Sequence, residues 1–542
     1  MSDPQTRSTC AITREHQRFL LRSLQFTQQY ASMYRQRMEV QYRSVLASLQ
    51  HACRGEPGAA APRRVLELEP GVASLAVGVL YKQMRLLPRF LDEYQKELVR
   101  IDAGDEENDD DGGGGGAETL PADEVATERA DGGTSLELAA SNEHYSVCHP
   151  ADELLLEDSS GRVVLDGLEV NYFCTGVVLG VCGTLLPNGH LQVRRYAFCG
   201  LQELYVPRGL PAAGATGRAP CYIAFVCGLN VGLGDDPRHR LALELLVSFM
   251  SGQMGEDATL FTRARHIARL VIGGNSIAMT EEQKLKLKVK LDPSDHVRLN
   301  DDKTQAGTVT SAKLMREFDK LLARLTATVE VELMPGDHDM SDAFQPQQPL
   351  HPVLLPTAAR LSSLRLVTNP FQFVAGDDGA EERASDGRAR FFVTSGQNMN
   401  DVARETRYTD RLAAMEMVVR SGCACPTAPN TLFSYPFRDE DPFLFGALPH
   451  AFVVCDQPRF ETRYAPLAAL EADSCRHVTA AAAGAGGRER EAAAKRSKLE
   501  EGAAPPGVRL VCVPSFQATG SVVLVDVHSP TLETSVVKLV GV

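Results

Sequence analysis

Paired cysteines are missing from this sequence. Its 542 residues include 13 cysteines, but no two stand in a Cys-x-x-Cys arrangement, and the closest spacing is Cys423-Ala-Cys425. A structural zinc site or a disulfide framework needs paired or regularly spaced cysteines. We therefore expect buried free thiols in a reducing compartment, and we predict neither a metal site nor a bound cofactor.

A surplus of basic charge and a long apolar run are also missing. The formal net charge is −14, but 13 acidic residues and one basic residue lie between Asp102 and Ala140, so the remainder is close to neutral. Any contact with DNA is therefore expected to be indirect. The longest apolar stretch, Tyr172 to Leu186, is interrupted by glycines and too short to span a bilayer, and the first residues are too polar for a secretory signal.

Compact catalytic signatures are absent as well. The run of five glycines at 112–116 is not followed by the Lys-Ser/Thr pair of a phosphate-binding loop. Neither a Gly-x-Ser-x-Gly elbow nor a His-Glu-x-x-His helix occurs. These absences argue against the nucleotide hydrolases, serine hydrolases and zinc proteases that carry such motifs.

What is present predicts an α+β protein of several parts, beginning with an N-terminal helical segment at residues 1–60. Phe19, Phe26, Tyr30 and Met33 recur at helical spacing within 12–51. We interpret this stripe as a face packed on the next domain. A nucleic-acid arm is the alternative.

Residues 61–219 predict a small β-barrel, preferably of the OB type. Strand-like runs cover 72–80, 153–157 and 162–165, and a hairpin joins 177–186 to 191–193 through Pro-Asn-Gly. Such a barrel binds either single-stranded nucleic acid or protein, and few aromatic residues look exposed here. The acidic and glycine-rich stretch 102–146 is expected to be a disordered insert.

Residues 220–542 alternate strand and helix patterns and predict an α/β layered domain with functional loops at strand ends. A second disordered insert is expected at 478–507. It contains Lys495, Arg496 and Lys498, a candidate nuclear localisation signal for which a solvated linker is the alternative.

One strand end in this domain carries the groups that a hydrolase uses. Residues 331–339 read Val-Glu-Leu-Met-Pro-Gly-Asp-His-Asp, an apolar run followed by a turn with two carboxylates and an imidazole. Two-metal phosphoesterases hold their ions with such groups, but they need ligands from several strand ends at once.

The other strand ends resemble a known family. VCGLNVG (226–232), VIGGNS (271–276), MPGDHD (334–339), TSGQNMNDV (394–402) and VVCDQP (453–458) occur in the order of a calcineurin-like metallophosphoesterase, in the degenerate form of the B-subunits of replicative DNA polymerases. The strings YKQMRLLP (81–88), QPQQPLHPVLLP (345–356) and LVTNPFQF (366–373) are similar to the delta branch of that family.

This resemblance implies an inactive site, because neutral or unsuitable residues stand at most positions where the family's active relatives have ligands. The positions compared are Gly228, Asn230, Asn275, Asp337, His338, Ser395, Asp456 and Pro458. Neither imidazole expected at the last strand end is present. The resemblance therefore implies no catalytic residue and no metal, and Asp337 and His338 are expected to bond local backbone groups.

The resemblance also implies a role: a non-catalytic accessory subunit that scaffolds DNA polymerase delta in the nucleus, for replication and repair synthesis. The implied partners are the catalytic subunit, through its C-terminal cysteine-rich module, and a third accessory subunit. Two alternatives remain open: a B-subunit of polymerase alpha or epsilon, and an active metal-dependent phosphodiesterase or nuclease.

Overall fold

The computed structural model describes residues 7–25, 27–54, 62–86, 146–201, 219–232, 236–254, 258–278, 301–376, 388–472, 475–477 and 505–539. Nearly all of the expected inserts 102–146 and 478–507 lie outside these residues, and so do Lys495, Arg496 and Lys498. Within the described residues, no helix is long and apolar enough to cross a membrane.

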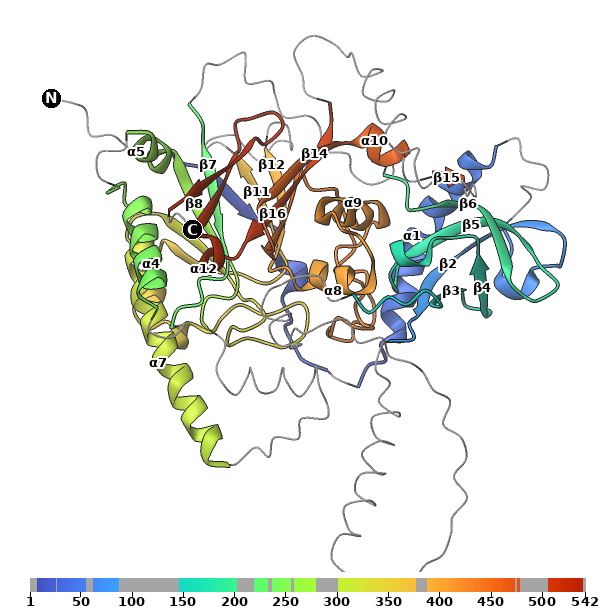
Figure 1. Ribbon diagram of the computed structural model, residues 1–542, viewed down its shortest axis with the longest axis horizontal. Coiled ribbons are helices and arrows are strands. Elements are labelled where there is room, and N and C mark those ends of the chain that lie inside the picture. Colours follow the sequence, from blue (N-terminus) through green and yellow to red (C-terminus); the bar gives the residue numbers. More distant parts are fainter. Residues whose placement is uncertain are drawn as a thin grey trace, which may run out of the picture.

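Two six-stranded sheets pack face to face and form the larger body, which we call the sandwich (Figure 1). Sheet I has the order β1 (Ala11–Arg14), β11 (Phe371–Gly376), β12 (Ala389–Thr394), β13 (Ala451–Gln457), β16 (Gly507–Pro514) and β14 (Glu461–Pro466). Sheet II has the order β10 (Leu364–Leu366), β9 (Glu330–Met334), β8 (Ile267–Gly273), β7 (Tyr222–Val226), β17 (Ser521–Asp526) and β18 (Thr534–Lys538).

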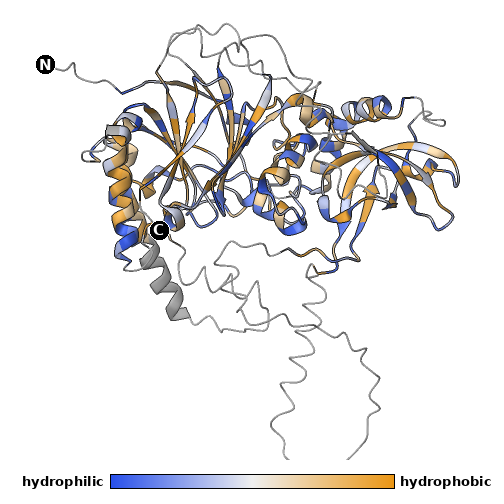
Figure 2. Cartoon of the chain, turned by 45° about the horizontal axis from the view of Figure 1, so that its top comes forward, coloured by the Kyte–Doolittle hydropathy of each residue, from blue (hydrophilic) through white to orange (hydrophobic). Residues whose placement is uncertain are grey.

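The central strands are apolar on both faces because both faces are covered. In β7, Ile223 and Phe225 point into the core between the sheets, whereas Ala224 and Val226 pack against the outer helices. Successive side chains of a strand point to opposite faces, so a strand buried on both sides reads as a continuous apolar run. Figure 2 shows hydrophobic residues concentrated on the strands.

Helices cover the outer faces of the sandwich. α4 (Pro237–Met250), α5 (Ala258–Arg265) and α7 (Asp301–Thr326) lie on sheet II, and α8 (Gln397–Glu405) and α9 (Arg411–Ser421) lie on sheet I (Figure 1). Asp236 caps α4 by accepting a hydrogen bond from the Arg238 amide at 2.9 Å, and Pro237 occupies the first turn. The short elements are η1 (Gln17–Phe19), η2 (Val65–Glu67), η3 (Val170–Tyr172), η5 (Pro352–Leu354), η6 (Ala358–Arg360), α10 (Leu467–Ala472) and α12 (Phe516–Thr519).

The smaller body is a closed barrel with the strand order of an OB fold. β2 (Ala73–Gln83), β3 (Glu153–Glu157), β4 (Arg162–Asp166), β6 (Leu191–Ala197) and β5 (Val178–Leu185) follow one another, and β5 pairs again with β2. β4 and β6 run parallel and the other neighbours run antiparallel. The expected barrel is therefore confirmed, and so is the expected hairpin, which joins β5 to β6. α1 (Ala31–Ala52) packs on β5, β2 and β6.

The two bodies exchange strands. β1 precedes the barrel in sequence but pairs antiparallel with β11 of sheet I. β15 (Cys475–His477) follows most of the sandwich in sequence but pairs antiparallel with β6 of the barrel. Sheet I therefore includes a strand that precedes the barrel in sequence, and the barrel sheet includes a strand that lies between two strands of the sandwich in sequence.

The helical expectation for 12–51 was wrong in its first half. Only Ala31–Ala52 is an α-helix, whereas Ala11–Arg14 is a strand and Gln17–Phe19 a single 3-10 turn. Phe19 is fully buried, as expected, but it packs against Phe392 of sheet I rather than on a helix face. Long-range pairing with β11 outweighs local helical spacing in this segment.

Candidate functional site

Five loops converge at the edge of the sandwich where β7, β8, β9, β12 and β13 end. The amide of Gly228 donates to the Gly274 carbonyl at 2.9 Å, and the amide of Asn230 donates to the Asn275 carbonyl at 3.1 Å. A Cβ added to Gly396 would collide with the Cys455 carbonyl oxygen. β7, β8 and β9 run parallel, as do β12 and β13, so their carboxyl ends meet at this edge.

Three non-glycine residues among those compared with metal ligands have a left-handed backbone. Asn230, Asn275 and Asp456 have φ values of 44°, 53° and 52°. Asn and Asp tolerate this conformation better than other non-glycine residues. Their residue types therefore fit the turns themselves, without any ligand.

The side chains from the first two strand ends are engaged with the protein. Asn275 is buried, and its Oδ1 accepts a hydrogen bond from the His338 amide at 3.2 Å. Nδ2 of Asn230 donates to Oε1 of Gln517 at 3.2 Å. Gly228 lies directly against Ser515, whose Oγ leaves no room for an added Cβ.

Asp339 holds two of these loops together. Its Oδ1 accepts from the Ser276 amide at 2.8 Å and from the Ile277 amide at 3.3 Å, and its Oδ2 accepts from the Gly336 amide at 2.9 Å. Burial raises the pKa of Asp339, although these three hydrogen bonds act in the opposite direction. This carboxylate is therefore occupied with backbone donors.

The structure brings together two carboxylates and an imidazole, those of Asp337, Asp456 and His338. Nε2 of His338 lies 3.9 Å from Oδ2 of Asp337. Burial raises the pKa of Asp456, while His338 lowers it and Asp337 raises it. The Asp337 side chain is 68% exposed and accepts a bond from Nε2 of Gln397 at 3.3 Å. Pro458 is exposed beyond the end of β13.

Ser395 belongs to a buried network of amides that sequence reasoning missed. Its Oγ accepts from Nδ2 of Asn369 at 2.6 Å and donates to Oε1 of Gln397 at 3.0 Å. Asn369 also donates to Oε1 of Gln347 at 2.7 Å, and Gln347 donates to the Gly336 carbonyl at 3.0 Å. The Asn and Gln residues of 345–348 and 369 were the available signal, because such amides are seldom buried without a network.

These donors do not fit a two-metal centre. Within the described ranges, no group of three or more His, Cys, Asp or Glu side chains is placed to hold a metal ion. The carboxylate of Asp339 accepts hydrogen bonds from three backbone amides, and the neutral Asn275 is engaged by the His338 amide. A pair of catalytic cations needs several carboxylates and imidazoles directed at one point.

A second polar centre lies at the seam between barrel and sandwich. Arg37 of α1 is fully buried, and its Nε donates to Oδ2 of Asp441 at 2.7 Å. Its guanidinium also donates to the carbonyls of Gly176, Pro426 and Ala428 at 2.8–2.9 Å. One side chain thus joins α1, the barrel and the segment that precedes β13.

Buried Lys82 and Glu405 form another part of the seam. Nζ of Lys82, on β2, donates to the Glu405 carbonyl, and the Glu405 carboxylate accepts from Thr431 Oγ1 at 2.6 Å and the Thr175 amide at 3.1 Å. Burial, with the nearby charge of Asp401, raises the pKa of Glu405 to about 7. We call Arg37, Asp441, Lys82 and Glu405 the seam residues.

Models of two families of polymerase subunits match the two bodies. The model of the DNA polymerase delta subunit OB-fold domain matches residues 29–196, and the model of the DNA polymerase alpha/epsilon B-subunit matches residues 223–462. Proteins named DNA polymerase delta small subunit are 28% identical to this chain in rice, Oryza sativa subsp. japonica (466 residues, 86% of this chain and 83% of the relative), and in Arabidopsis thaliana (505 residues, 93% and 89%).

Over most of its length, the chain is therefore similar to DNA polymerase delta small subunits. The small subunit of Saccharomyces cerevisiae is also 28% identical, over 418 residues that cover 72% of this chain and 70% of the relative. The match at 29–196 includes α1 as well as the barrel, and the second match begins within β7. The resemblance expected from the sequence is thus confirmed.

Proposed function

We propose that this chain is a non-catalytic accessory subunit of DNA polymerase delta that acts as a scaffold in nuclear replication and repair synthesis. The observation that carries this proposal is that the polar groups of the strand-end loops are engaged in hydrogen bonds within the protein. Their polar groups bond one another, as Asp339 does with three amides, whereas the buried charges join the two bodies at the seam. Such an arrangement suits a rigid body that positions partners.

We further propose that the sandwich is a calcineurin-like phosphoesterase fold that has lost its activity. At the compared positions stand Gly228, Asn230, Asn275, Ser395 and Pro458, and the charged residues left are Asp337, His338 and Asp456. Asn275 is engaged by the His338 amide and Ser395 by amide side chains. Activation of a water molecule by two cations is therefore not expected.

An activity assay tests the loss of phosphoesterase function. The purified chain, incubated with manganese and either single-stranded DNA or a simple phosphodiester, should show no turnover above buffer. Asp337→Ala serves as the matched variant, because this carboxylate is largely exposed. Metal-dependent hydrolysis that disappears in this variant would overturn the assignment and favour the active phosphodiesterase.

The partner that we propose is the catalytic subunit of polymerase delta, bound through its C-terminal cysteine-rich module. The similarity to polymerase delta small subunits supports association with the catalytic subunit, and a third accessory subunit is proposed on the same ground. The contact is expected on the folded body made of barrel and sandwich. Permanent interfaces between different chains commonly bury more than about 2,000 Å² and are comparatively apolar.

Co-expression tests the partner directly. The chain and the cysteine-rich module should elute together from a sizing column in moderate salt, and deleting the module from the full polymerase should abolish the association. Separate elution, or an association that survives the deletion, would contradict the scaffold proposal in its central point.

Nuclear localisation is part of the proposal. Lys495, Arg496 and Lys498 are the candidate import signal, and their replacement by alanine should shift a fluorescently labelled chain towards the cytoplasm. An unchanged distribution would indicate import with a partner or through another segment.

A further inference from the structure

Two pairs of cysteine side chains meet in the core between sheets I and II. The thiol of Cys221 lies beside that of Cys10, and the thiol of Cys227 lies beside that of Cys455. None of these four is in a disulfide, nor is any other cysteine whose side chain the structure describes. Each pair bridges the sheets, because Cys10 directly precedes β1 and Cys455 lies in β13, whereas Cys221 and Cys227 flank β7.

The two pairs differ in their access to solvent. Cys10 is 5% exposed and its neighbour Thr9 is exposed, whereas Cys227 and Cys455 are 0% exposed. The Cys221 thiol also reaches the Thr9 carbonyl at 3.8 Å. Cys221 is 1% exposed, so the pair approaches the surface through Cys10, at the edge of sheet I.

The two pairs also differ in electrostatic environment. The hydrogen bond from Cys221, with the nearby charges of Arg269 and His528, lowers the pKa of Cys10, although burial acts in the opposite direction. Burial raises the pKa of Cys227 well above its usual value. Since the thiolate is the reactive form, Cys10 is the better nucleophile of the two.

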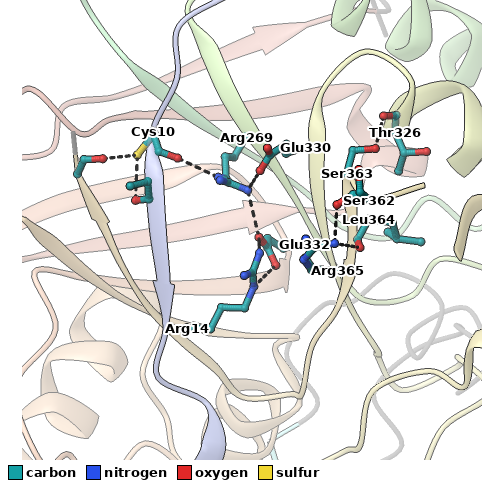
Figure 3. Close-up of polar contacts among 12 residues, drawn as sticks. Cys10, Arg14, Arg269, Thr326, Glu330, Glu332, Ser362, Ser363, Leu364 and Arg365 are labelled. Carbon is teal, nitrogen blue, oxygen red and sulfur yellow. Dashed lines mark hydrogen bonds and ion pairs between the residues drawn. The ribbon is translucent and has the colours of Figure 1, made fainter. Parts of the chain in front are cut away.

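β1 is an edge strand held by a few polar anchors (Figure 3). The Cys10 carbonyl accepts from Nε of Arg269 at 3.1 Å, and Arg14 binds Glu332 with Nε–Oε2 at 3.0 Å and Nη2–Oε1 at 2.6 Å. Edge strands open locally more easily than core strands. Such opening would admit a small oxidant to Cys10.

We propose that Cys10 and Cys221 form an oxidative modification site, at which hydrogen peroxide converts the two thiols into a disulfide that ties β1 to β7. The Cys10 thiolate attacks one peroxide oxygen, the O–O bond breaks, and one water leaves after protonation. The Cys221 thiolate then attacks the resulting sulfenic acid, the S–O bond breaks, and a second water leaves. Two thiols are oxidised by two electrons and one peroxide is reduced.

Peptide mapping tests the site in the folded full-length chain. After treatment with hydrogen peroxide and alkylation of the remaining thiols, trypsin releases Ser8–Arg14, which contains Cys10, and Ala219–Arg238, which contains both Cys221 and Cys227. We expect these two peptides to be cross-linked under non-reducing conditions. The cross-link should persist in Cys227→Ser and disappear in Cys221→Ser.

The deeper pair is the internal control. A cross-link between the peptides of Cys227 and Cys455 is not expected at the same peroxide concentration, and it should appear only after unfolding in denaturant. The proposal is overturned if no Cys10–Cys221 cross-link forms, if it persists in Cys221→Ser, or if both pairs oxidise at equal rates in the folded chain.

Hydrogen exchange supplies a second measurement that does not depend on variants. Oxidation should slow amide exchange in Ser8–Arg14 several-fold, and reduction with dithiothreitol should restore the original rate. Unchanged exchange in a cross-linked sample would show that the disulfide does not fasten β1, and it would overturn that part of the proposal.

Discussion

The strand-end loops and the seam place their charges differently. At the strand ends, the side chain of Asp337 is largely exposed, and the buried carboxylate of Asp339 is bonded to backbone amides. At the seam, Arg37 and Asp441 are both fully buried and bonded to each other. Burying a charge is costly unless it is paired and hydrogen-bonded, so ion pairs are retained inside proteins where they serve a purpose.

This contrast shows which polar groups hold the molecule together. The loops could lose Asp337 without leaving a buried group unbonded. The loss of Arg37, in contrast, would remove the hydrogen bonds that it donates to one buried carboxylate and three carbonyls. Variants at both centres test that difference, and they are ordered here by the size of the expected effect.

Arg37→Ala should cause the largest loss. It leaves Asp441 buried without its ion-pair partner, which typically costs about 3–5 kcal/mol. Urea unfolding of the purified chain measures the change. Arg35→Ala is the matched control, since Arg35 lies on the exposed face of the same helix and should change stability by less than about 0.5 kcal/mol. Equal effects of the two variants would contradict the role given to the seam.

Asp339→Ala should cause an intermediate loss. Three backbone amides, of Gly336, Ser276 and Ile277, lose their acceptor, and unsatisfied buried donors cost about 1–3 kcal/mol. Asp337→Ala, two residues earlier, removes an exposed carboxylate and should be nearly neutral. A larger effect of Asp337→Ala than of Asp339→Ala in urea unfolding would reverse the description of this loop.

Glu405 should make a smaller, pH-dependent contribution. Burial and Asp401 raise its folded pKa to about 7, above the unfolded value, so the folded state binds the proton more tightly. Its contribution to stability is therefore favourable below the unfolded pKa and is lost as pH rises towards 7, at up to about 1.4 kcal/mol per pH unit.

Comparison with Glu405→Gln isolates this effect, because the contributions of the other titrating groups to the unfolding free energy cancel in the difference between the two proteins. The free energy of unfolding should be measured for both proteins at pH 5.5, 6.5 and 7.5. The value of the original protein should fall relative to that of the variant as pH rises. Lys82, Asp401 and Thr431 face the carboxylate in both proteins. A difference that is constant over this range would contradict the raised pKa.

Much of the fold could be predicted because its strands are buried on both faces. Runs such as 222–226 and 451–455 are apolar throughout, and glycine follows or precedes most of the strand ends. β1 could not be predicted, since four residues of mixed polarity carry no periodic signal and their partner, β11, lies far along the chain.

The position of the candidate site could be predicted from the loops in the sequence, but the hydrogen bonds within the site could not. Parallel strands bring Asn275, Asp337 and Asp456 to one edge, as the order of strand and helix patterns indicates. The bond from the His338 amide to Asn275 joins residues 63 positions apart, and no local pattern reports such a contact. Arg37 gave a weak signal in the sequence, because a charged residue interrupts the buried face of α1 that includes Met33 and Val45.

The exchange of β1 and β15 has a consequence for synthesis on the ribosome. Cys10 and its acceptor Gly376 lie 366 positions apart. At about 5–20 residues per second, the first strand waits roughly 20–70 s after leaving the exit tunnel before β11 exists to receive it. During that interval its backbone donors and the Cys10 thiol have no sheet to join. Expression systems that slow elongation would lengthen this exposure, and fragments cut between barrel and sandwich would make it permanent.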